Sequence, residues 1–429
     1  MCAAPLTPKQ FQEAEGTGHW RALNAGVDAW FAAASHAAGA ELVRRVGELA
    51  EAAGHHPDVD LRATGVHFRL FTHDARSLTD KDVQLARQIS AAADELGLVA
   101  DPSAVQRMQL AIDASDIAAV LPFWQIALGF DRADTDLLSD PLQRHPRVWF
   151  QQMDEPRPLR NRIHVDAGTP WDLTDAKLAA LEAAGGRVSY QTRWWKTVAD
   201  SEGNEVDVFP LAPDDLASAQ GTQDWRAMLT AAVHYPTADF PQGVDFVESV
   251  ARLADAAGLP LLIDLRYPGV TIDSGKDQQE ADGFAALAAQ VQSAARDLGL
   301  VAETSKVHDF QLGIDAMDIP PVREFWRVAL GYVEDPRQEV TDLFDPRRLN
   351  PPVFFQQMDE PREQRNRIHV DLFVPQDQAQ TRGGAAVAAG GRVVHDGDAP
   401  FWWTVADPEG NEIDIAVVVG RAEHWTDEG

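Results

Sequence analysis

The chain has 429 residues, of which 45% are hydrophobic and 24% charged, a composition typical of globular domains with large cores. Its formal net charge of −30 repels phosphate backbones, so the composition argues against nucleic acid as a partner. No apolar run reaches the roughly 20 residues that span a bilayer, and the N-terminus lacks the pattern of a signal peptide. We therefore expect a cytoplasmic protein with no membrane partner. The single cysteine, Cys2, excludes an internal disulfide and a thiolate metal cage.

The sequence contains a long internal repeat. FQQMDEPR begins at Phe150 and again at Phe355, and RNRIHVD begins at Arg160 and again at Arg365, an offset of 205 residues in both cases (355 − 150 and 365 − 160). The repeat of a solenoid is roughly 20–50 residues long, whereas this longer period indicates a duplicated two-domain unit. We predict four domains, at residues 1–103, 104–212, 213–304 and 305–420, with residues 213–223 as a linker between the two units.

The first domain is predicted to mix helices and strands. Apolar residues at helical spacing predict a helix over residues 38–53, which Gly54 ends. Residues 59–62 and 66–72 follow as strands, the second with apolar and polar residues in alternation. A further helix begins at Thr79, where the pattern of a capping box is present.

Acidic residues and histidines recur in this domain at characteristic spacings. In chain order the motif comprises Glu51, His55, His56, Pro57, His73 and Asp82. This pattern resembles the pterin-4a-carbinolamine dehydratase family, and the resemblance covers nearly all of residues 1–102. It implies dehydration of a 4a-hydroxytetrahydropterin by a hydro-lyase that needs no metal or redox cofactor. One position departs from the family pattern, because Ala63 stands where the family has an aromatic residue.

The resemblance also implies a role for each motif residue. His56 and His73 would transfer protons, while His55 would protonate or position the departing hydroxyl. The remaining motif residues, Glu51, Pro57 and Asp82, are expected to form the substrate site, with Glu51 able to orient His55. Dehydration requires an acid for the hydroxyl and a base for a ring N–H, and imidazole can serve as either near neutral pH. The alternatives are a decayed domain kept as an assembly surface and a metal site.

The second domain is predicted to contain strands at residues 108–114, 148–153, 163–166 and 205–209 and helices at 117–128 and 174–184. This order, and its repeat in the fourth domain, resembles the vicinal oxygen chelate (glyoxalase) superfamily, in which paired βαβββ modules surround a cleft. The fold class expected for the whole chain is α+β, a tandem duplication of a dehydratase-like sandwich and a paired βαβββ domain. The resemblance is informative about the fold and says little about the activity.

The third domain aligns with the first but lacks its histidines. With Gly258 set against Gly54, the three positions of His55, His56 and His73 hold Leu259, Pro260 and Asp277. Tyr267 keeps the aromatic residue that the first domain lacks at Ala63. We predict that this copy is catalytically inactive and that it packs against the first as an internal pseudo-dimer; a homo-oligomer is the alternative.

Metal-dependent members of the superfamily place ligands on four strands of a cleft. Each copy supplies one such set here, namely Gln109, Gln151 or Gln152, His164 and Asp207, and then Gln311, Gln356 or Gln357, His369 and Asp414. One histidine, one carboxylate and two neutral amides are poor ligands for a divalent metal. We therefore expect clefts that bind a small molecule without a metal, or that have a purely structural role.

Three functions are compatible with the sequence. The first is a 4a-hydroxytetrahydrobiopterin dehydratase that acts on a small-molecule pterin through the histidines of the first domain. The second is a binding or resistance protein that holds a small molecule in its glyoxalase-like clefts. The third is a metal-dependent lyase, isomerase or dioxygenase that acts in the same clefts.

Overall fold

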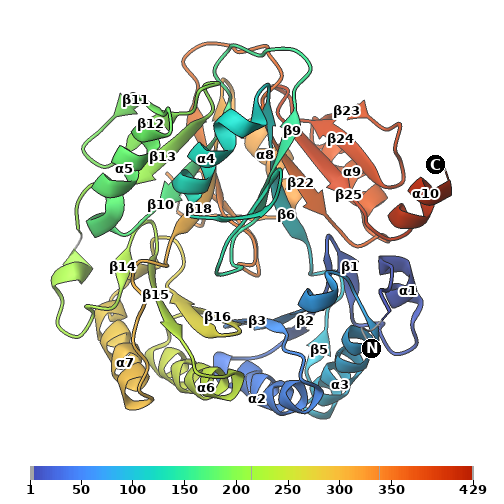
Figure 1. Ribbon diagram of the computed structural model, residues 1–429, viewed down its shortest axis with the longest axis vertical. Helices are drawn as coiled ribbons and strands as arrows, with labels where there is room; N and C mark the ends of the chain where they lie inside the picture. Colours follow the sequence, from blue (N-terminus) through green and yellow to red (C-terminus); the bar gives the residue numbers. More distant parts are fainter. Residues whose placement is uncertain (1–3, 214, 338, 428–429) are drawn as a thin grey trace.

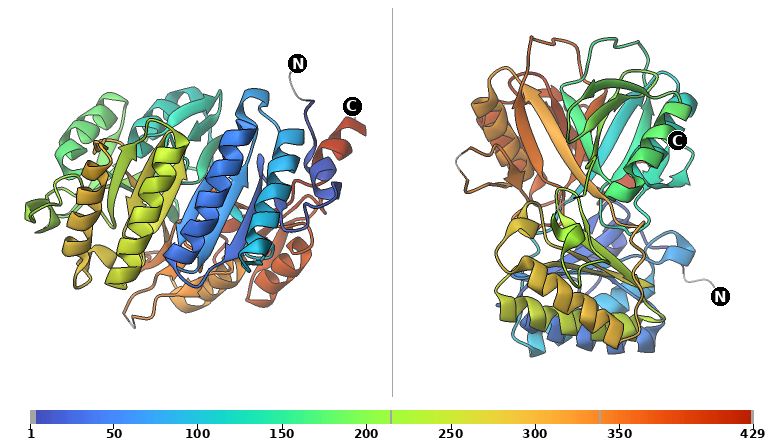
Figure 2. Two further views of the ribbon diagram at one scale, coloured as in Figure 1. Left: turned by 90° about the horizontal axis from the view of Figure 1, so that it is seen from below. Right: turned by 90° about the vertical axis from the view of Figure 1, so that its left-hand side faces the viewer.

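Three β-sheets in two layers organise the computed structural model, which describes residues 4–213, 215–337 and 339–427. A nine-stranded sheet forms the lower layer in Figure 1, and the long helices α2, α3, α6 and α7 cover its outer face (Figure 2). Two eight-stranded sheets form the upper layer. Cys2 lies outside the described residues. Within the described part of the chain, no helix is both long and apolar enough to cross a membrane.

The first domain supplies about half of the lower layer and confirms the helices and strands predicted for it. Its elements are α1 (Pro8–Glu13), β1 (Arg21–Leu23), β2 (Gly26–Ala32), α2 (His36–Ala53), β3 (Asp58–Arg62), β4 (Gly65–Leu70), the 3₁₀ turn His73–Ala75, α3 (Asp80–Glu95) and β5 (Val99–Ala100). Helix α2 stops where Gly54 adopts the left-handed conformation (φ 56°). Thr79 and Asp82 form the predicted capping box at the start of α3.

The third domain repeats this arrangement. Its elements are the 3₁₀ turn Asp215–Ser218, β14 (Arg226–Ala227), β15 (Ala231–Pro236), α6 (Phe240–Ala257), β16 (Leu262–Arg266), β17 (Gly269–Asp273), the 3₁₀ turn Gln278–Glu280 and α7 (Phe284–Asp297). The mixture of helices and strands confirms the predicted α+β class.

The segment predicted as a linker is instead part of this domain. Leu216 is buried, and the Thr222 hydroxyl donates to the carbonyl oxygens of Leu216 and Ala219. The Thr17 hydroxyl makes the same pair of bonds in the first domain. The prediction of a linker over residues 213–223 was therefore wrong from Leu216 onward, because the repeated unit begins earlier than its apolar pattern indicates.

One strand pair joins the two domains into a single sheet. Strands β3 and β16 are antiparallel neighbours, with Asp60 opposite Asp264. Each carboxylate accepts from an arginine of the other copy: Arg266 Nη2 lies 2.5 Å from Asp60, and Arg62 Nη1 lies 2.7 Å from Asp264. Burial opposes ionisation of Asp60, but Arg266 and His67 hold its pKa well below the usual range. Helices α2 and α6 pack together beneath the pair, so the predicted internal pseudo-dimer is confirmed.

The second and fourth domains form the upper layer. The second contains β6 (Arg107–Ala114), α4 (Ile117–Leu128), β7 (Asp131–Asp134), β8 (Leu137–Ser139), β9 (Arg147–Gln152), β10 (Ile163–Gly168), α5 (Thr174–Ala183), β11 (Arg187–Gln191), β12 (Lys196–Ala199) and β13 (Glu205–Phe209). The fourth contains β18 (Asp309–Ala316), α8 (Ile319–Leu330), β19 (Val333–Glu334), β20 (Leu343–Phe344), β21 (Val353–Gln357), β22 (Ile368–Phe373), α9 (Ala379–Ala388), β23 (Arg392–His395), β24 (Trp402–Ala406), β25 (Glu412–Ala416) and α10 (Arg421–Asp427).

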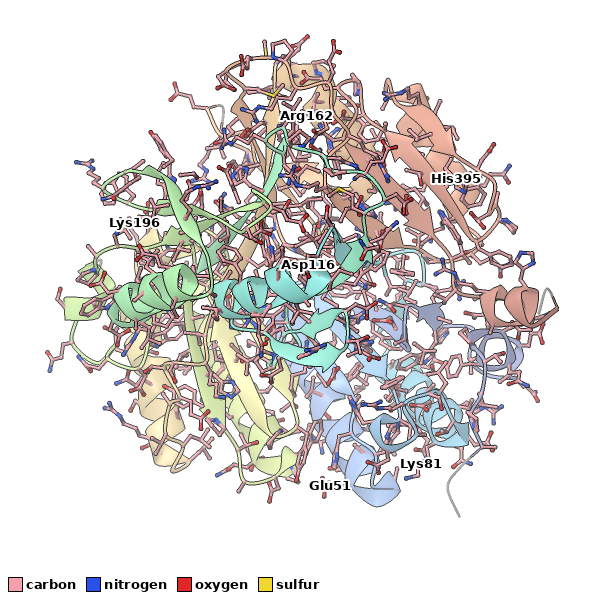
Figure 3. The ribbon with its side chains drawn as sticks, turned by 45° about the horizontal axis from the view of Figure 1, so that its top comes forward. Glu51, Lys81, Asp116, Arg162, Lys196 and His395 are labelled. Atoms are coloured by element: carbon pink, nitrogen blue, oxygen red, sulfur yellow. The ribbon has the colours of Figure 1, made fainter. Side chains whose placement is uncertain are left out.

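These two domains exchange halves. Strand β10 of the second domain pairs with β18 of the fourth, and β22 of the fourth pairs with β6 of the second. Each eight-stranded sheet therefore combines the first half of one copy with the second half of the other. The repeated RNR residues hold the crossing: Arg162 Nε donates to Asn411 and Arg367 Nε to Asn204, each over 2.8 Å. Figure 3 shows Arg162 at this crossing.

We predict that Gly39→Ala destabilises the lower layer. A Cβ at this position of α2 would lie 2.5 Å from Leu61 Cδ1 and 2.7 Å from Val66 Cγ2, on the strands beneath. Overpacking of this kind lowers the free energy of unfolding by about 1–3 kcal/mol. Gly384→Ala is the matched control, because its Cβ would meet no atom within 4 Å and should raise helix stability by about 0.5–1 kcal/mol. Urea unfolding measures both, and equal stabilities for the two variants would contradict the packing of α2 described above.

Candidate functional site

The end of helix α2 positions the first two motif histidines. The His55 backbone N–H bonds to the Ala50 carbonyl over 3.1 Å, so the chain reverses immediately after Gly54. His55 then turns inward, where its side chain is 8% exposed and its Nε2 lies 2.8 Å from Asp82 Oδ1. The side chain of His55 therefore points into the domain, and that of His56 lies at its surface.

Asp82 connects this loop to the turn that carries the third histidine. Its Oδ2 accepts from the Thr72 hydroxyl over 2.6 Å and from the Thr79 backbone N–H over 2.7 Å. The Asp82 carboxylate, expected in the substrate site, is fully buried. Pro57, also expected in the substrate site, is buried as well. Asp82 is a positioning residue that holds His55.

His56 lies at the surface beside Glu51. The His56 Nε2 atom is 2.6 Å from Glu51 Oε1, and the two side chains are 25% and 45% exposed. We expected Glu51 to orient His55, and the structure corrects this, because the reversal of the chain after α2 brings the second histidine back over the helix. Figure 3 shows Glu51 at the outer end of α2.

The third motif histidine lies on an exposed turn. His73 is the first residue of the turn that follows Thr72, and its ring packs edge-on against Phe71, with the ring centroids 5.4 Å apart. Because Thr72 bonds to Asp82, this turn is tied to the same carboxylate that holds His55. The two segments that carry the motif histidines therefore share one buried anchor.

Two aromatic residues of the third domain enclose His56. Tyr267 stacks on the imidazole, with the centroids 5.0 Å apart and the planes inclined by 11°. Phe240 contacts the same ring at 4.9 Å. Tyr267 is the residue that aligns with Ala63, and its own side chain is 56% exposed. The third domain therefore places its aromatic residue against a motif histidine of the first domain.

A second cluster of polar residues lies in one of the composite clefts of the upper layer. His164, Asp166 and Asp207 place their ligand atoms within 4.8 Å of one another. His164 Nε2 is 3.5 Å from Asp166 Oδ1, and the other Asp166 oxygen accepts from the Gln311 amide over 2.6 Å. Burial raises the pKa of Asp166 to about 7; Asp207 adds to the effect, and His164 opposes it.

The other composite cleft repeats the cluster with His369, Asp371 and Asp414. This cleft has a volume of about 1100 Å³, and Gln109 and Gln151 of the opposite copy line it. His369 Nε2 lies 3.6 Å from Asp371 Oδ1. Burial raises the pKa of Asp371 to about 6, an effect that Asp414 strengthens and His369 opposes.

Comparison with known proteins identifies the first domain of the lower layer. The family model described as pterin 4 alpha carbinolamine dehydratase matches residues 4–92. A protein of that name from Acidobacterium capsulatum is 38% identical over 89 residues, which are 20% of this chain and 97% of that protein. The chain belongs to the pterin-4a-carbinolamine dehydratase family. A relative of the same name from Mycolicibacterium vanbaalenii is 57% identical over 51 residues, and the match spans 12% of this chain and 55% of that protein.

The upper layer is matched separately from the dehydratase layer. A model described as a glyoxalase-like domain matches residues 109–209 and 311–416, one match in each copy. Glyoxalase I from Zea mays aligns with 75% of this chain and 95% of its own chain, at 10% sequence identity and a TM-score of 0.39. The two family models thus place one dehydratase-family domain and two glyoxalase-like domains in a single chain.

The structure regroups the expected cleft residues. The ligand sets were assigned to single copies, and this assignment was wrong: Gln311 lies with His164, and Gln109 lies with His369, because the copies exchange halves. Sequence reasoning also missed Asp166 and its counterpart Asp371. The signal was present, since residues i and i+2 of a strand share a face, and both aspartates follow their histidine by two residues.

Proposed function

We propose that the chain is a 4a-hydroxytetrahydropterin dehydratase with one site, at the histidines of its first domain. The observation that carries the proposal is the pairing of each adjacent histidine with its own carboxylate, His55 with Asp82 and His56 with Glu51. The family membership of residues 4–92 supports it. The physiological reaction is then the loss of water from the 4a-carbinolamine to give a quinonoid dihydropterin.

The proposed chemistry needs one acid and one base. The acid protonates the 4a-hydroxyl as the C–O bond breaks, and the base removes the proton of a ring N–H, so that a C=N bond forms and water leaves. His56 and His73 are suited to these transfers, because both reach the surface and can return their protons to solvent afterwards. His55 is largely buried and fixed by Asp82, which suits a group that orients the hydroxyl.

The third domain contributes to this site without motif histidines of its own. The flat face of Tyr267 lies over His56 and limits how the imidazole can turn. At the equivalent place on the other side of the pseudo-dimer, Pro260 stands for His56 and Ala63 for Tyr267. The histidine and the aromatic residue are present together on one side and absent together on the other.

Replacement of the proton-transfer residues should abolish dehydration. We expect His56→Ala/His73→Ala to lower turnover of freshly generated 4a-hydroxytetrahydropterin by about 10²–10⁴-fold, because general acid and base catalysis is lost. Ultraviolet absorbance in the presence of a chelator follows the reaction. His395→Ala, an exposed histidine of β23 in the upper layer, is the control and should keep the wild-type rate. A wild-type rate equal to the uncatalysed reaction would refute the proposal.

Loss of the stacked tyrosine should weaken the site without removing its proton-transfer groups. We expect Tyr267→Ala to raise KM by roughly two- to tenfold, the range expected for one aromatic contact, with a smaller change in kcat. Ala63→Tyr is the matched control, because it adds the aromatic residue on the side of the pseudo-dimer that lacks the motif histidines. Steady-state kinetics separates the two parameters, and an unchanged KM in Tyr267→Ala would show that the ring does not shape the site.

We propose a second function for the composite clefts, the binding of a divalent cation. Among the described residues, Asp166 Oδ1, Asp371 Oδ1 and Asp414 Oδ1 are buried without a hydrogen-bond partner. A histidine and two carboxylates in each cleft form a better ligand set than the one expected from a single copy. A cation bound there would polarise a substrate oxygen. The histidine and the two aspartates of each cluster would hold it.

The raised pKa values predict how pH acts on these clefts. In chelator, Asp166 and Asp371 keep protons in the folded chain up to about pH 7 and 6, whereas an unfolded aspartate loses its proton near pH 4. Stability should therefore fall as pH rises from about 4 to 7, and Asp166→Asn should flatten the fall, while the exposed Asp245→Asn should not.

Addition of Mn²⁺ should raise the melting temperature more at pH 8 than at pH 5. No gain at either pH would exclude the cation site.

A further inference from the structure

Three arginines meet where the two layers of the molecule face each other. Arg69 lies on β4, Arg107 opens β6, and Arg147 opens β9. All three line a cavity of about 30 Å³, and Arg69 and Arg107 also line an adjoining cavity of about 110 Å³ between the nine-stranded sheet and the upper layer. The combined space admits a few water molecules or one small ion.

Most of this positive charge has no partner in the protein. Arg107 Nη2 is 2.7 Å from Asp28 Oδ1, but that carboxylate also serves His67 at 2.9 Å. Among the described residues, the side chains of Arg69 and Arg147 form no hydrogen bond or ion pair. Arg69 is 8% exposed, and its Nε is buried without an acceptor. Burial removes the hydration of such a guanidinium, and no hydrogen bond or ion pair compensates for that loss.

The cluster also repels itself. Burial, and then the charge of Arg107, lower the pKa of Arg69 to about 9. The same two causes lower the pKa of Arg147. The charge of Asp58 acts on both arginines and opposes this effect, yet Asp58 also faces Arg266, whose Nε lies 3.9 Å from Asp58 Oδ1. A bound anion would relieve both the repulsion and the desolvation.

The repeat shows that the scaffold does not require these arginines. Arg69 corresponds to Asp273 on β17, at an offset of 204 residues (273 − 69). Arg107 corresponds to Asp309 at an offset of 202 (309 − 107), and Arg147 to Pro352 at an offset of 205 (352 − 147). Asp273 is neutralised there by Arg144, at 2.6 Å. The position of Arg69 is thus an acid with an ion-pair partner in the other copy, and neither of the other two counterparts is a base. Gly26 also leaves room, because a Cβ there would lie 2.7 Å from Arg69 Nε.

We propose that Arg69, Arg107 and Arg147 form a binding site for a small oxyanion of the phosphate or carboxylate type. Guanidinium groups match such oxygens in charge and in geometry. Residues of both layers line the two cavities and none of the motif histidines is among them, so the site is separate from the proposed dehydratase site. Asn24 lines both this cavity and the cleft of His369, and its amide donates to Gln109 over 3.0 Å. An anion held here borders that cleft.

Calorimetric titration of the full chain with inorganic phosphate, at constant ionic strength, tests the proposal. We expect saturable binding of one phosphate to the wild type and binding weaker by at least about tenfold in Arg147→Gln, since a charge-assisted contact is lost. Arg132→Gln removes an equal charge from an exposed position of β7 in the same domain and should bind as the wild type does. Titration with malonate as a second arm decides between phosphate and carboxylate as the preferred ligand.

A second variant separates binding from a structural role. We expect Arg69→Met to melt at or above the wild-type temperature without phosphate, because an unpartnered buried charge is removed, and to gain nothing when phosphate is added. A fall in melting temperature of equal size with and without phosphate would show that Arg69 is structural and would overturn the proposal. The absence of saturable binding of both phosphate and malonate to the wild type would overturn it as well. Neither result bears on the dehydratase activity, which is measured separately.

Discussion

The antiparallel pairing of β3 with β16 is the constraint on which the lower layer depends. Two buried aspartates face each other across this pair, and each is neutralised by an arginine from the opposite copy, so neither domain completes its own electrostatics. The pairing extends the sheet across both domains and brings α6 against α2. It also carries Phe240 and Tyr267 of one copy to His56 of the other. Packing and the proposed chemistry therefore rest on the same interface.

The upper layer follows the same rule by a different route. There the copies exchange half-domains, and the buried residues Arg162 and Arg367 bond across the exchange to Asn411 and Asn204. Each cleft then takes its histidine and aspartates from one copy and a glutamine from the other. Substitutions in one copy thus reach two clefts.

The sequence predicts the local elements well, because helix and strand periodicity and capping are local properties. Helix α4 and strand β13 begin and end at the residues expected, and Gly54 and Thr79 cap as predicted. Pairings between copies could not be predicted in this way. From the sequence, strand β10 could pair with either β6 or β18, because these two strands have nearly the same apolar pattern. The structure shows that β10 pairs with β18. The contact of Tyr267 with His56 could not be predicted for the same reason. Aligning the two copies shows which residues are equivalent, but it does not show which residues of one copy contact the other.

The stacking of Tyr267 on His56 means that the two halves of the chain are not interchangeable parts. A homodimer built only from the first half would carry the motif histidines twice, each facing an alanine in place of the ring. A homodimer of the second half would carry the ring twice and no motif histidine. Fusion in one polypeptide guarantees that each molecule contains one of each, at a fixed ratio that free subunits could not enforce. The covalent link thus keeps the domain that carries the motif histidines beside the domain that carries the stacked ring.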